Sequence, residues 1–268
     1  MIFCGRHGKP NPAGLPGEKP EKDLCIAPGL VISNALCAYL EGPRAVIVSD
    51  LHLGMEAVAA ADGAYFPRRQ KPVIMRRLKD ILNRFRPELF VIAGDFKHNF
   101  SANLGQEMDE VREVFEYLDS RTQVVLTRGN HDNYLRTLLP DVPLPDSVLV
   151  GASFVCHGHK DLPAPGRFRG LKLIGHEHPA LKLRDAIGAP VSAPAFIYHE
   201  ESRTLVVPAI SPLAVGADIL RAEPIAPALR RLDRRQFRLF AASEQGVLDF
   251  RTVGMLESSI APPDDGIG

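Results

Sequence analysis

Three short apolar runs, at residues 45–48, 89–93 and 123–126, set the strongest constraint on how this chain can fold. Each run is apolar without alternation, as expected for a strand that is buried on both faces. The runs are separated by segments near residues 67–86 and 108–118, where apolar residues recur at helical spacing. Strand, helix, strand, helix and strand in this order predict βαβ units around a largely buried sheet.

The pattern changes beyond residue 147, where short strand-like runs follow one another and helical signals are scarce. The clearest of these runs lie at 148–156, 171–174, 196–199 and 204–208. A second sheet packed on the first fits this pattern better than a continued doubly wound sheet. The predicted fold class is therefore α/β, with two mostly buried mixed sheets.

Polar residues able to bind a metal directly follow several of these runs. They are Asp50 and His52, Asp95 with His98, Asn130-His131-Asp132, His157 and His159, and His176 and His178. Seven of the nine histidines lie in or beside these motifs, which is not expected of histidines that are scattered for structural reasons. Ligands bind beyond the carboxyl ends of strands in layered α/β folds. Carboxylate, amide and imidazole groups without thiolate suit a catalytic site for Mn, Fe or Zn ions and not a closed structural zinc site.

The motif series D-x-H, GD, GNHD, H and GHxH resembles the calcineurin-like metallophosphoesterases over residues 45–210. The resemblance implies a four-layer αββα sandwich, in which two facing sheets are flanked by helices. It also implies two divalent metal ions that clamp a phosphate and activate a water molecule for phosphoester hydrolysis. Manganese is the expected ion, with iron, zinc or nickel as alternatives.

The resemblance also implies a role for each matching residue. Asp50, His52 and His178 would hold the first ion, Asp95 would bridge both ions, and Asn130, His157 and His176 would complete the second site. His131 would protonate the leaving oxygen or bind the phosphate, and Asp132 would orient His131. The choice of His157 over His159 as the ligand stays open at this point. Arg128 and His159 are further candidate substrate-binding residues.

The element Gly94-Asp95-x-x-His98 is similar to one in SbcD-type DNA repair nucleases, in which the extra histidine contacts the substrate phosphate. His98 is therefore a candidate for both catalysis and substrate binding. Other motifs resemble the smaller SbcD-related phosphoesterases of archaea and bacteria, including the ligase-associated PdeM group. With few residues after the site domain, we expect no ATPase partner of the full SbcD type, and the sequence leaves a homodimer open.

The substrate stays open between two classes. A phosphodiesterase or nuclease acting on nucleic-acid or nucleotide phosphodiesters would use the basic residues of 68–86 and 230–235 as a backbone track. Alternatively, the basic residues of the helix at 68–86 simply form its solvent-exposed face and have no part in substrate binding. The alternative substrates are small or cyclic nucleotides and other small phosphoesters. A non-catalytic interaction module on the same fold is disfavoured because His131 and every metal position are filled.

Composition bears on location and on domain organisation. The formal net charge is zero, so no global basic field indicates nucleic-acid binding. The four cysteines are expected to be free thiols in a reducing compartment, and with neither a signal peptide nor a membrane span the protein is expected in the cytoplasm.

We expect a disordered leader at 1–22, a metallophosphoesterase domain at 23–221, a basic segment and β-hairpin packed on it at 222–256, and a disordered tail at 257–268.

Overall fold

Two β-sheets pack face to face in the computed structural model, which describes residues 21–64, 67–162, 168–184 and 187–260. The first sheet has the strand order β1-β2-β3-β4-β5-β6, and β4, β5 and β6 run parallel. Its strands are β1 (Asp23–Ala27), β2 (Leu30–Ser33), β3 (Cys37–Leu40), β4 (Ala45–Val48), β5 (Leu89–Ala93) and β6 (Gln123–Thr127). Residues 23–40 form three of these strands, and Gly29, with φ of 72°, permits the tight turn between β1 and β2.

The second sheet has the order β13-β10-β11-β12-β9-β8-β7, and β14 and β15 extend it from β11. Its strands are β7 (Ser147–Val150), β8 (Ser153–Cys156), β9 (Leu171–Ile174), β10 (Pro179–Arg184), β11 (Pro190–His199), β12 (Thr204–Val206), β13 (Ala217–Asp218), β14 (Arg238–Ala242) and β15 (Val247–Thr252). The parallel trio β8, β9 and β12 brings three strand ends to one edge.

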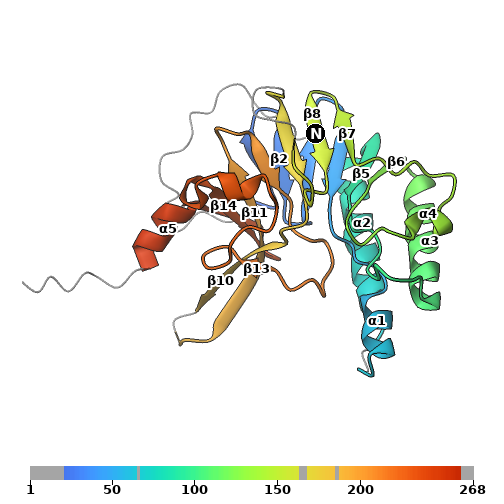
Figure 1. Ribbon diagram of the computed structural model, residues 1–268. Coiled ribbons are helices and arrows are strands. Elements are labelled where there is room, and N and C mark those ends of the chain that lie inside the picture. Colours follow the sequence, from blue (N-terminus) through green and yellow to red (C-terminus); the bar gives the residue numbers. More distant parts are fainter. Residues whose placement is uncertain (1–20, 65–66, 163–167, 185–186, 261–268) are drawn as a thin grey trace, which may run out of the picture.

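Helices cover the outer face of the first sheet, on the right in Figure 1. They are α1 (Met55–Ala61), α2 (Gln70–Phe85), α3 (Gly105–Asp119) and α4 (Leu135–Leu138). The Glu56 side chain of α1 accepts hydrogen bonds from the first backbone N–H groups of α2, at Arg69 (2.7 Å) and Gln70 (2.9 Å), and so caps that helix. The helix ends at Arg86, which is left-handed and precedes Pro87.

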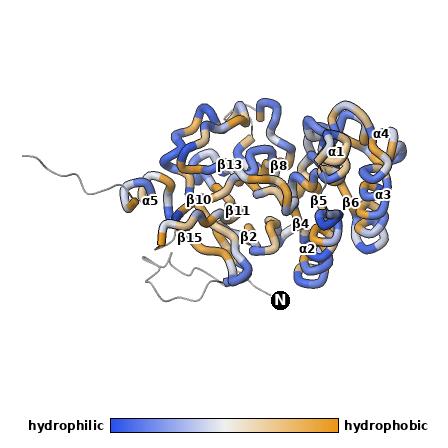
Figure 2. Tube along the Cα trace, turned by 90° about the horizontal axis from the view of Figure 1, so that it is seen from below, coloured by the Kyte–Doolittle hydropathy of each residue, from blue (hydrophilic) through white to orange (hydrophobic). Residues whose placement is uncertain are grey.

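The core has three apolar layers, and the trace in Figure 2 shows hydrophobic residues gathered along the strands. One cluster lies between the sheets, a second between the first sheet and its helices, and a third on the outer face of the second sheet. The outer layer on the second sheet is thin, consisting of the 3-10 turns η1 (Leu229–Arg231) and η2 (Arg234–Gln236) and of α5 (Val253–Ile260). The predicted α/β class with two mixed, layered sheets is confirmed.

The chain after residue 222 extends the second sheet. The β14–β15 hairpin pairs with β11, and α5 packs beside η2. The tail predicted at 257–268 begins too early, because residues 257–260 form the end of α5, where Glu257 pairs with Arg234 and Arg235. The rest of that tail, and residues 1–20 of the predicted leader, lie outside the described residues.

Cysteines and membrane propensity can also be checked. Cys37 and Cys156 are free and buried, and burial raises the pKa of Cys156 to about 12. Cys25 takes part in a disulfide bond, so the expectation that all four thiols are free is wrong. This exposed residue lies on the edge strand β1. Among the helices in the described ranges, none has the length and apolar character needed to span a bilayer.

Candidate metal centre

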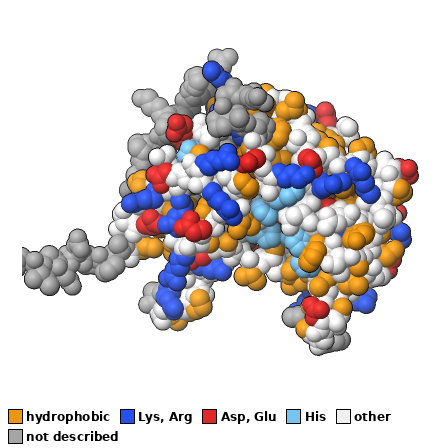
Figure 3. Space-filling view, viewed as in Figure 1, with side chains coloured by type: hydrophobic (Ala, Val, Ile, Leu, Met, Phe, Trp, Pro, Cys, Tyr) orange, Lys and Arg blue, Asp and Glu red, His pale blue; other side chains and the backbone are white. Residues whose placement is uncertain are grey.

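The carboxyl ends of β4, β5, β6, β8 and β9 meet at one edge of the two sheets, and the loop after each strand carries candidate residues. The bridge between Ser49 and Ala209 joins the two sheets there, and the bridge between Leu53 and Lys97 joins the loops after β4 and β5. Histidine side chains reach the surface in the middle of the face shown in Figure 3, with Lys and Arg side chains around them. The sequence-predicted motifs therefore gather in one place.

A first group of donors consists of Asp50, His52 and His178. The Nε2 atom of His178 lies 3.1 Å from Oδ1 of Asp50 and 3.2 Å from Nε2 of His52. Asp50 is fully buried and His52 nearly so. Ser49, which the sequence reasoning missed, donates its hydroxyl to Oδ2 of Asp50 at 2.5 Å and so fixes the carboxylate. All three donor atoms thus point into one small volume.

Asp95 lies between this group and a second one. Its Oδ2 atom is 3.7 Å from Nε2 of His52 and 3.3 Å from Nε2 of His157. The same His157 nitrogen is 3.0 Å from Oδ1 of Asn130. The other ring nitrogen, Nδ1, lies 3.0 Å from the carbonyl oxygen of Ala93, to which it can donate a proton. That bond leaves Nε2 of His157 free to bind a metal, as in many histidine–metal sites.

His176 and His159 lie further from the converging donors. The His176 ring centroid is 4.9 Å from that of His157, and the His159 centroid is 5.3 Å from it. Among the described residues, the groups of donors that lie within 4.8 Å of one another include neither histidine. His157, and not His159, therefore sits beside Asp95. His176 instead donates its backbone N–H to Oδ2 of Asp50, at 3.1 Å.

The backbone at this edge is strained. Half of the described non-glycine residues with positive φ are candidate ligands: Asp50 (57°), His52 (48°), Asp95 (50°), His176 (70°) and His178 (42°). Each such conformation costs about 1–3 kcal/mol, and it persists only where the surroundings hold it. Strain of this kind is typical of functional sites.

Two glycines permit the close approach of these loops. A Cβ atom on Gly129 would lie 2.0 Å from Oδ1 of Asp95, and one on Gly175 would lie 1.6 Å from Oγ of Ser49. Neither position has room for a side chain. The glycines of the GNHD and GHxH motifs are therefore packing requirements of the carboxylates Asp95 and Asp50.

Asp132 does not orient His131, which corrects the role that the resemblance implied. Its buried carboxylate accepts hydrogen bonds from four backbone N–H groups, at Asp95 (2.9 Å), Phe96 (2.9 Å), Lys97 (3.3 Å) and Gly129 (2.8 Å). Burial, together with the nearby charge of Asp95, raises the pKa of Asp132 to about 6. Because backbone amides occupy both oxygens, Asp132 holds the Asp95 loop against the GNHD turn.

His131 is oriented by His98 instead. Its Nδ1 atom contacts the carbonyl oxygen of His98, and the two rings stack with centroids 5.2 Å apart. Nε2 of His131 then points toward Oδ2 of Asp95, at 4.0 Å. The His98 ring contacts the first group, with its Nδ1 atom 3.2 Å from Nδ1 of His52. His131 and His98 thus line the open side of the donor cluster.

The His98 loop rests on a buried ion pair that the sequence reasoning also missed. Lys97 and Glu107 are fully buried, with Nζ and Oε2 3.3 Å apart. The other oxygen of Glu107 accepts hydrogen bonds from the backbone N–H groups of His98 (2.9 Å) and Asn99 (2.7 Å). The sequence signal for this pair was Lys97, which follows Asp95 by two residues at the end of a buried strand. Its partner Glu107 lies on α3 and could not be identified from the same signal.

Burial keeps several histidines neutral. It lowers the pKa of His52 to about 3, and that of His98 and His176 to about 4. Burial would also lower the pKa of His157, but its contacts with Asp95 and Asp50 outweigh that effect and raise it to about 9. The pKa of Asp50 is lowered because His178 and His157 outweigh its burial. A divalent cation requires neutral imidazoles beside ionised carboxylates, a state that His52 and His176 already have and that His157 reaches by losing a proton.

Several side chains of the basic segments have internal partners. On α2, Lys71 pairs with Glu113, Arg77 with the carbonyl oxygen of Ile210, and Arg84 with Asp23 and Asp80. In the 230–235 cluster, the partners are Pro224, Asp161, Ile219 and Glu257. These contacts favour a structural role for both segments over a phosphate track. Arg128 remains beside the motif, and its Nε atom is buried without a hydrogen-bond partner.

Glu177, between His176 and His178, was given no role by the sequence. Its carboxylate accepts hydrogen bonds from the backbone N–H groups of Ile225, at 3.2 Å, and Ala226, at 2.5 Å. The segment after β13 is thereby attached to the loop that carries two histidines of the centre. Burial is the main cause that raises the pKa of the Glu177 carboxyl group.

Comparisons with known proteins agree with this geometry. A family model described as calcineurin-like phosphoesterase matches residues 43–185, more than half of the 268 residues. The nuclease MPE of Pseudomonas putida has a similar fold, with a TM-score of 0.58 and 24% identity over 82% of this chain and 94% of that chain. Yfce, a phosphoesterase from E. coli, aligns with a TM-score of 0.41 and 17% identity over 76% of this chain and 96% of that one, a likeness too weak to carry a conclusion. No curated protein sequence matches.

Proposed function

Because this chain belongs to the calcineurin-like phosphoesterase family and is a metal-dependent hydrolase, we propose that it hydrolyses phosphodiesters of nucleic acids or nucleotides with two divalent ions, manganese being preferred. The observation that carries the proposal is the position of Asp95 between two groups of donors, with His131 at their open side. Asp50, His52 and His178 would hold one ion. Asn130, His157 and His176 would hold the other, and Asp95 would be shared.

When bound, the ions supply Lewis acidity, which neutralises charge on the phosphoryl oxygens and lowers the pKa of water. The protein's own residues then bind and move protons. His131 donates Nδ1–H to the carbonyl oxygen of His98, so its Nε2 atom is the one that can carry a proton to the leaving oxygen. His98, stacked on it, offers a donor to a phosphoryl oxygen. Asp132 acts through the backbone by fixing the Asp95 loop.

An exposed aromatic residue next to His131 supports a nucleotide substrate. Phe100 is 60% exposed, and its ring centroid lies 6.0 Å from that of His131. Tyr134, which is 43% exposed, follows the same GNHD motif. An exposed aromatic ring beside a catalytic histidine offers a face on which a base can stack. Stacking of a base on such a ring contributes about 1–3 kcal/mol.

The open shape of this face also supports an extended substrate. The α1 helix and the β10–β11 hairpin project on either side of the histidine-lined edge in Figure 1, and the histidines are visible at the surface in Figure 3. An open face flanked by two projections suits a strand better than an enclosed pocket would. The nuclease activity named for the P. putida structure is in line with this proposal.

The finer assignments belong to the same proposal. The element Gly94-Asp95-x-x-His98 favours a place among the smaller SbcD-related phosphoesterases, and the 23–221 core would be the catalytic unit with 222–256 packed on it. A cytoplasmic location remains our prediction.

The test is hydrolysis by metal-stripped protein to which manganese is returned. A chromogenic bis-aryl phosphodiester, the matching monoester, cyclic nucleotides and short single-stranded DNA are compared side by side. We expect cleavage of DNA and diester with little monoester activity. Activity confined to small esters would replace the proposal with the small-phosphoester alternative.

A second arm uses Phe100→Ala and DNA that contains an abasic site at the cleaved position. We expect the substitution to raise KM about 5-fold to 150-fold for intact DNA, the range that corresponds to stacking of one base, and to leave KM for abasic DNA unchanged. Phe100→Trp should preserve the wild-type KM. Equal losses on both DNAs would show that Phe100 does not stack on a base.

A further inference from the structure

A cavity of about 540 Å³ lies on the outer side of the second sheet, away from the metal centre. It is bounded by the first residues of β9 and β12, by the turn between β11 and β12, and by η1. The candidate ligands follow the opposite end of β9, where His176 and His178 lie. The cavity is therefore a separate site, and the hydrolytic reaction proposed above does not use it.

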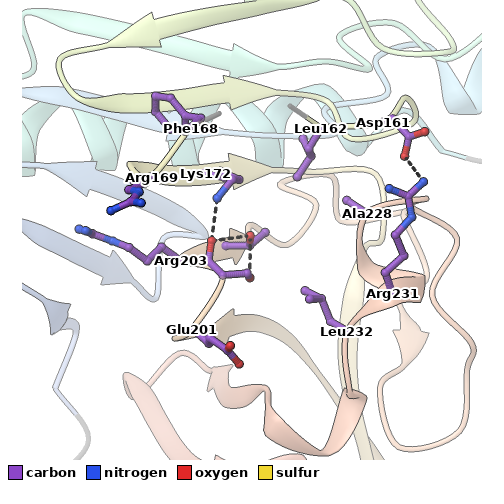
Figure 4. Close-up of a pocket in the computed structure, with 12 residues that line it drawn as sticks. Asp161, Leu162, Phe168, Arg169, Lys172, Glu201, Arg203, Ala228, Arg231 and Leu232 are labelled. Atoms are coloured by element: carbon purple, nitrogen blue, oxygen red, sulfur yellow. Dashed lines mark hydrogen bonds and ion pairs between the residues drawn. The ribbon is translucent and has the colours of Figure 1, made fainter. Parts of the chain in front are cut away.

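One end of the cavity is cationic. Arg169, Lys172 and Arg203 line it, and Figure 4 shows the guanidinium groups of Arg169 and Arg203 on the same side. Within the described part of the chain, none of the three makes an ion pair. Lys172 is only 8% exposed, and its Nζ atom donates to the carbonyl oxygen of Ser202 at 2.7 Å. Burial and the charge of Arg203 lower the pKa of Lys172.

Cationic side chains that share one end of a cavity without a counter-charge attract anions. Burial of an ammonium group without a carboxylate costs several kcal/mol by general estimates. The other arginine of the cavity is different, because Nη2 of Arg231 lies 3.1 Å from Oδ1 of Asp161. Glu201 also lines the cavity, but its carboxylate points away from the two guanidinium groups in Figure 4. Among the residues that the structure describes, no carboxylate pairs with the cationic end, whereas Arg231 pairs with Asp161.

Apolar side chains line another part of the cavity. Leu162 and Leu232 lie at the end opposite Arg169 and Arg203, and Phe168 lies along one side. The Phe168 ring also faces Lys172, whose Nζ atom is 5.9 Å from the ring centroid. A lining of this kind, with a few convergent charged groups, is typical of small-molecule sites.

We propose that this cavity binds a small organic anion, with its oxyanion group between Arg169, Lys172 and Arg203 and its apolar body against Leu162, Phe168 and Leu232. The two arginines supply planar donors that match an oxyanion. Lys172 supplies a positive charge that is largely shielded from solvent. The volume accommodates a ligand the size of an aryl phosphate or sulfonate.

The test uses 8-anilinonaphthalene-1-sulfonate, an aromatic sulfonate that fluoresces when it leaves water and that contains no phosphoester bond. We expect the manganese-loaded wild-type protein to bind one molecule, and inorganic phosphate to compete. Arg169→Ala with Arg203→Ala should weaken binding by about tenfold or more, because two charge-assisted contacts are lost. The matched control is Arg76→Ala with Arg112→Ala, which removes two exposed arginines from the helices over the first sheet.

A third variant, Leu232→Ser, should weaken dye binding without affecting phosphate competition for the cationic end. Circular dichroism and thermal melting of each variant report whether it is folded. Absence of dye binding to the wild type, several weak dye sites, or equal affinity in both arginine variants would overturn the proposal. Because the readout is fluorescence, its failure is independent of whether the protein hydrolyses phosphodiesters.

Discussion

The two ends of β9 differ in how the protein holds its charged groups. At the carboxyl end, the donors Asp50, His52, Asp95 and His157 are buried. Backbone groups fix Asp95 and His157, which contact the N–H of His131 and the carbonyl oxygen of Ala93. At the amino end, Arg169 and Arg203 lie in water at the mouth of a cavity. Donors that are fixed in place are preorganised for chemistry. Exposed arginines adjust their position to a ligand, and each contributes less free energy of binding. Substitutions should therefore have much larger effects at the metal centre than at the cavity.

The largest effect is expected for Asp95→Ala. Asp95 lies between both donor groups, so its loss should abolish occupancy of at least one ion and remove detectable hydrolysis. Metal content by mass spectrometry and diester turnover check this, with the exposed Asp141→Ala as the matched control. Full metal content in Asp95→Ala would show that Asp95 is not shared by the ions.

His131→Ala should come next, with turnover lower by about 10²–10⁴-fold and with both ions retained. The reason is that His131 contacts the open side of the cluster and its Nε2 atom is only within 4.0 Å of Asp95. The discriminating measurement pairs kcat with metal content. Wild-type turnover in the variant would remove His131 from the reaction.

Asp132→Asn tests the corrected role of that carboxylate. An amide group would turn N–H toward the backbone N–H groups of the Asp95 loop, so we expect metal affinity to fall about 10–100-fold, as for other groups that position ligands. Manganese titrations measure the change, with Asp141→Asn as the control. A loss of kcat at unchanged metal affinity would instead indicate that Asp132 acts on His131.

The smallest effect concerns protons. His157 has its pKa raised to about 9 in the metal-free protein, and it must be neutral to bind an ion. Metal binding at neutral pH should therefore release a proton, and affinity should fall as pH drops below about 9, by up to about tenfold per pH unit. Calorimetry in buffers of different ionisation enthalpy measures the release. Equal binding heats in all buffers at pH 7 would contradict it.

The sequence determined the features that depend on local pattern. Residue type and period located the strands at 45–48, 89–93 and 123–126 and the two main helices, and the motifs after the strands identified the candidate ligands. These features can be predicted because the spacing of apolar residues and the glycines at strand ends depend on only a few neighbouring residues. The change of pattern beyond residue 147 likewise predicted the second sheet.

Only the tertiary structure decided which atoms meet. It placed His157 beside Asn130, moved Asp132 from His131 to the backbone of Asp95, and paired Lys97 with Glu107. It also showed that Arg84 pairs with Asp23, whereas Arg169 and Arg203 have no ion-pair partner among the described residues. Local pattern carries little of this information, because each contact joins loops or elements that only the packing of sheets and helices brings together.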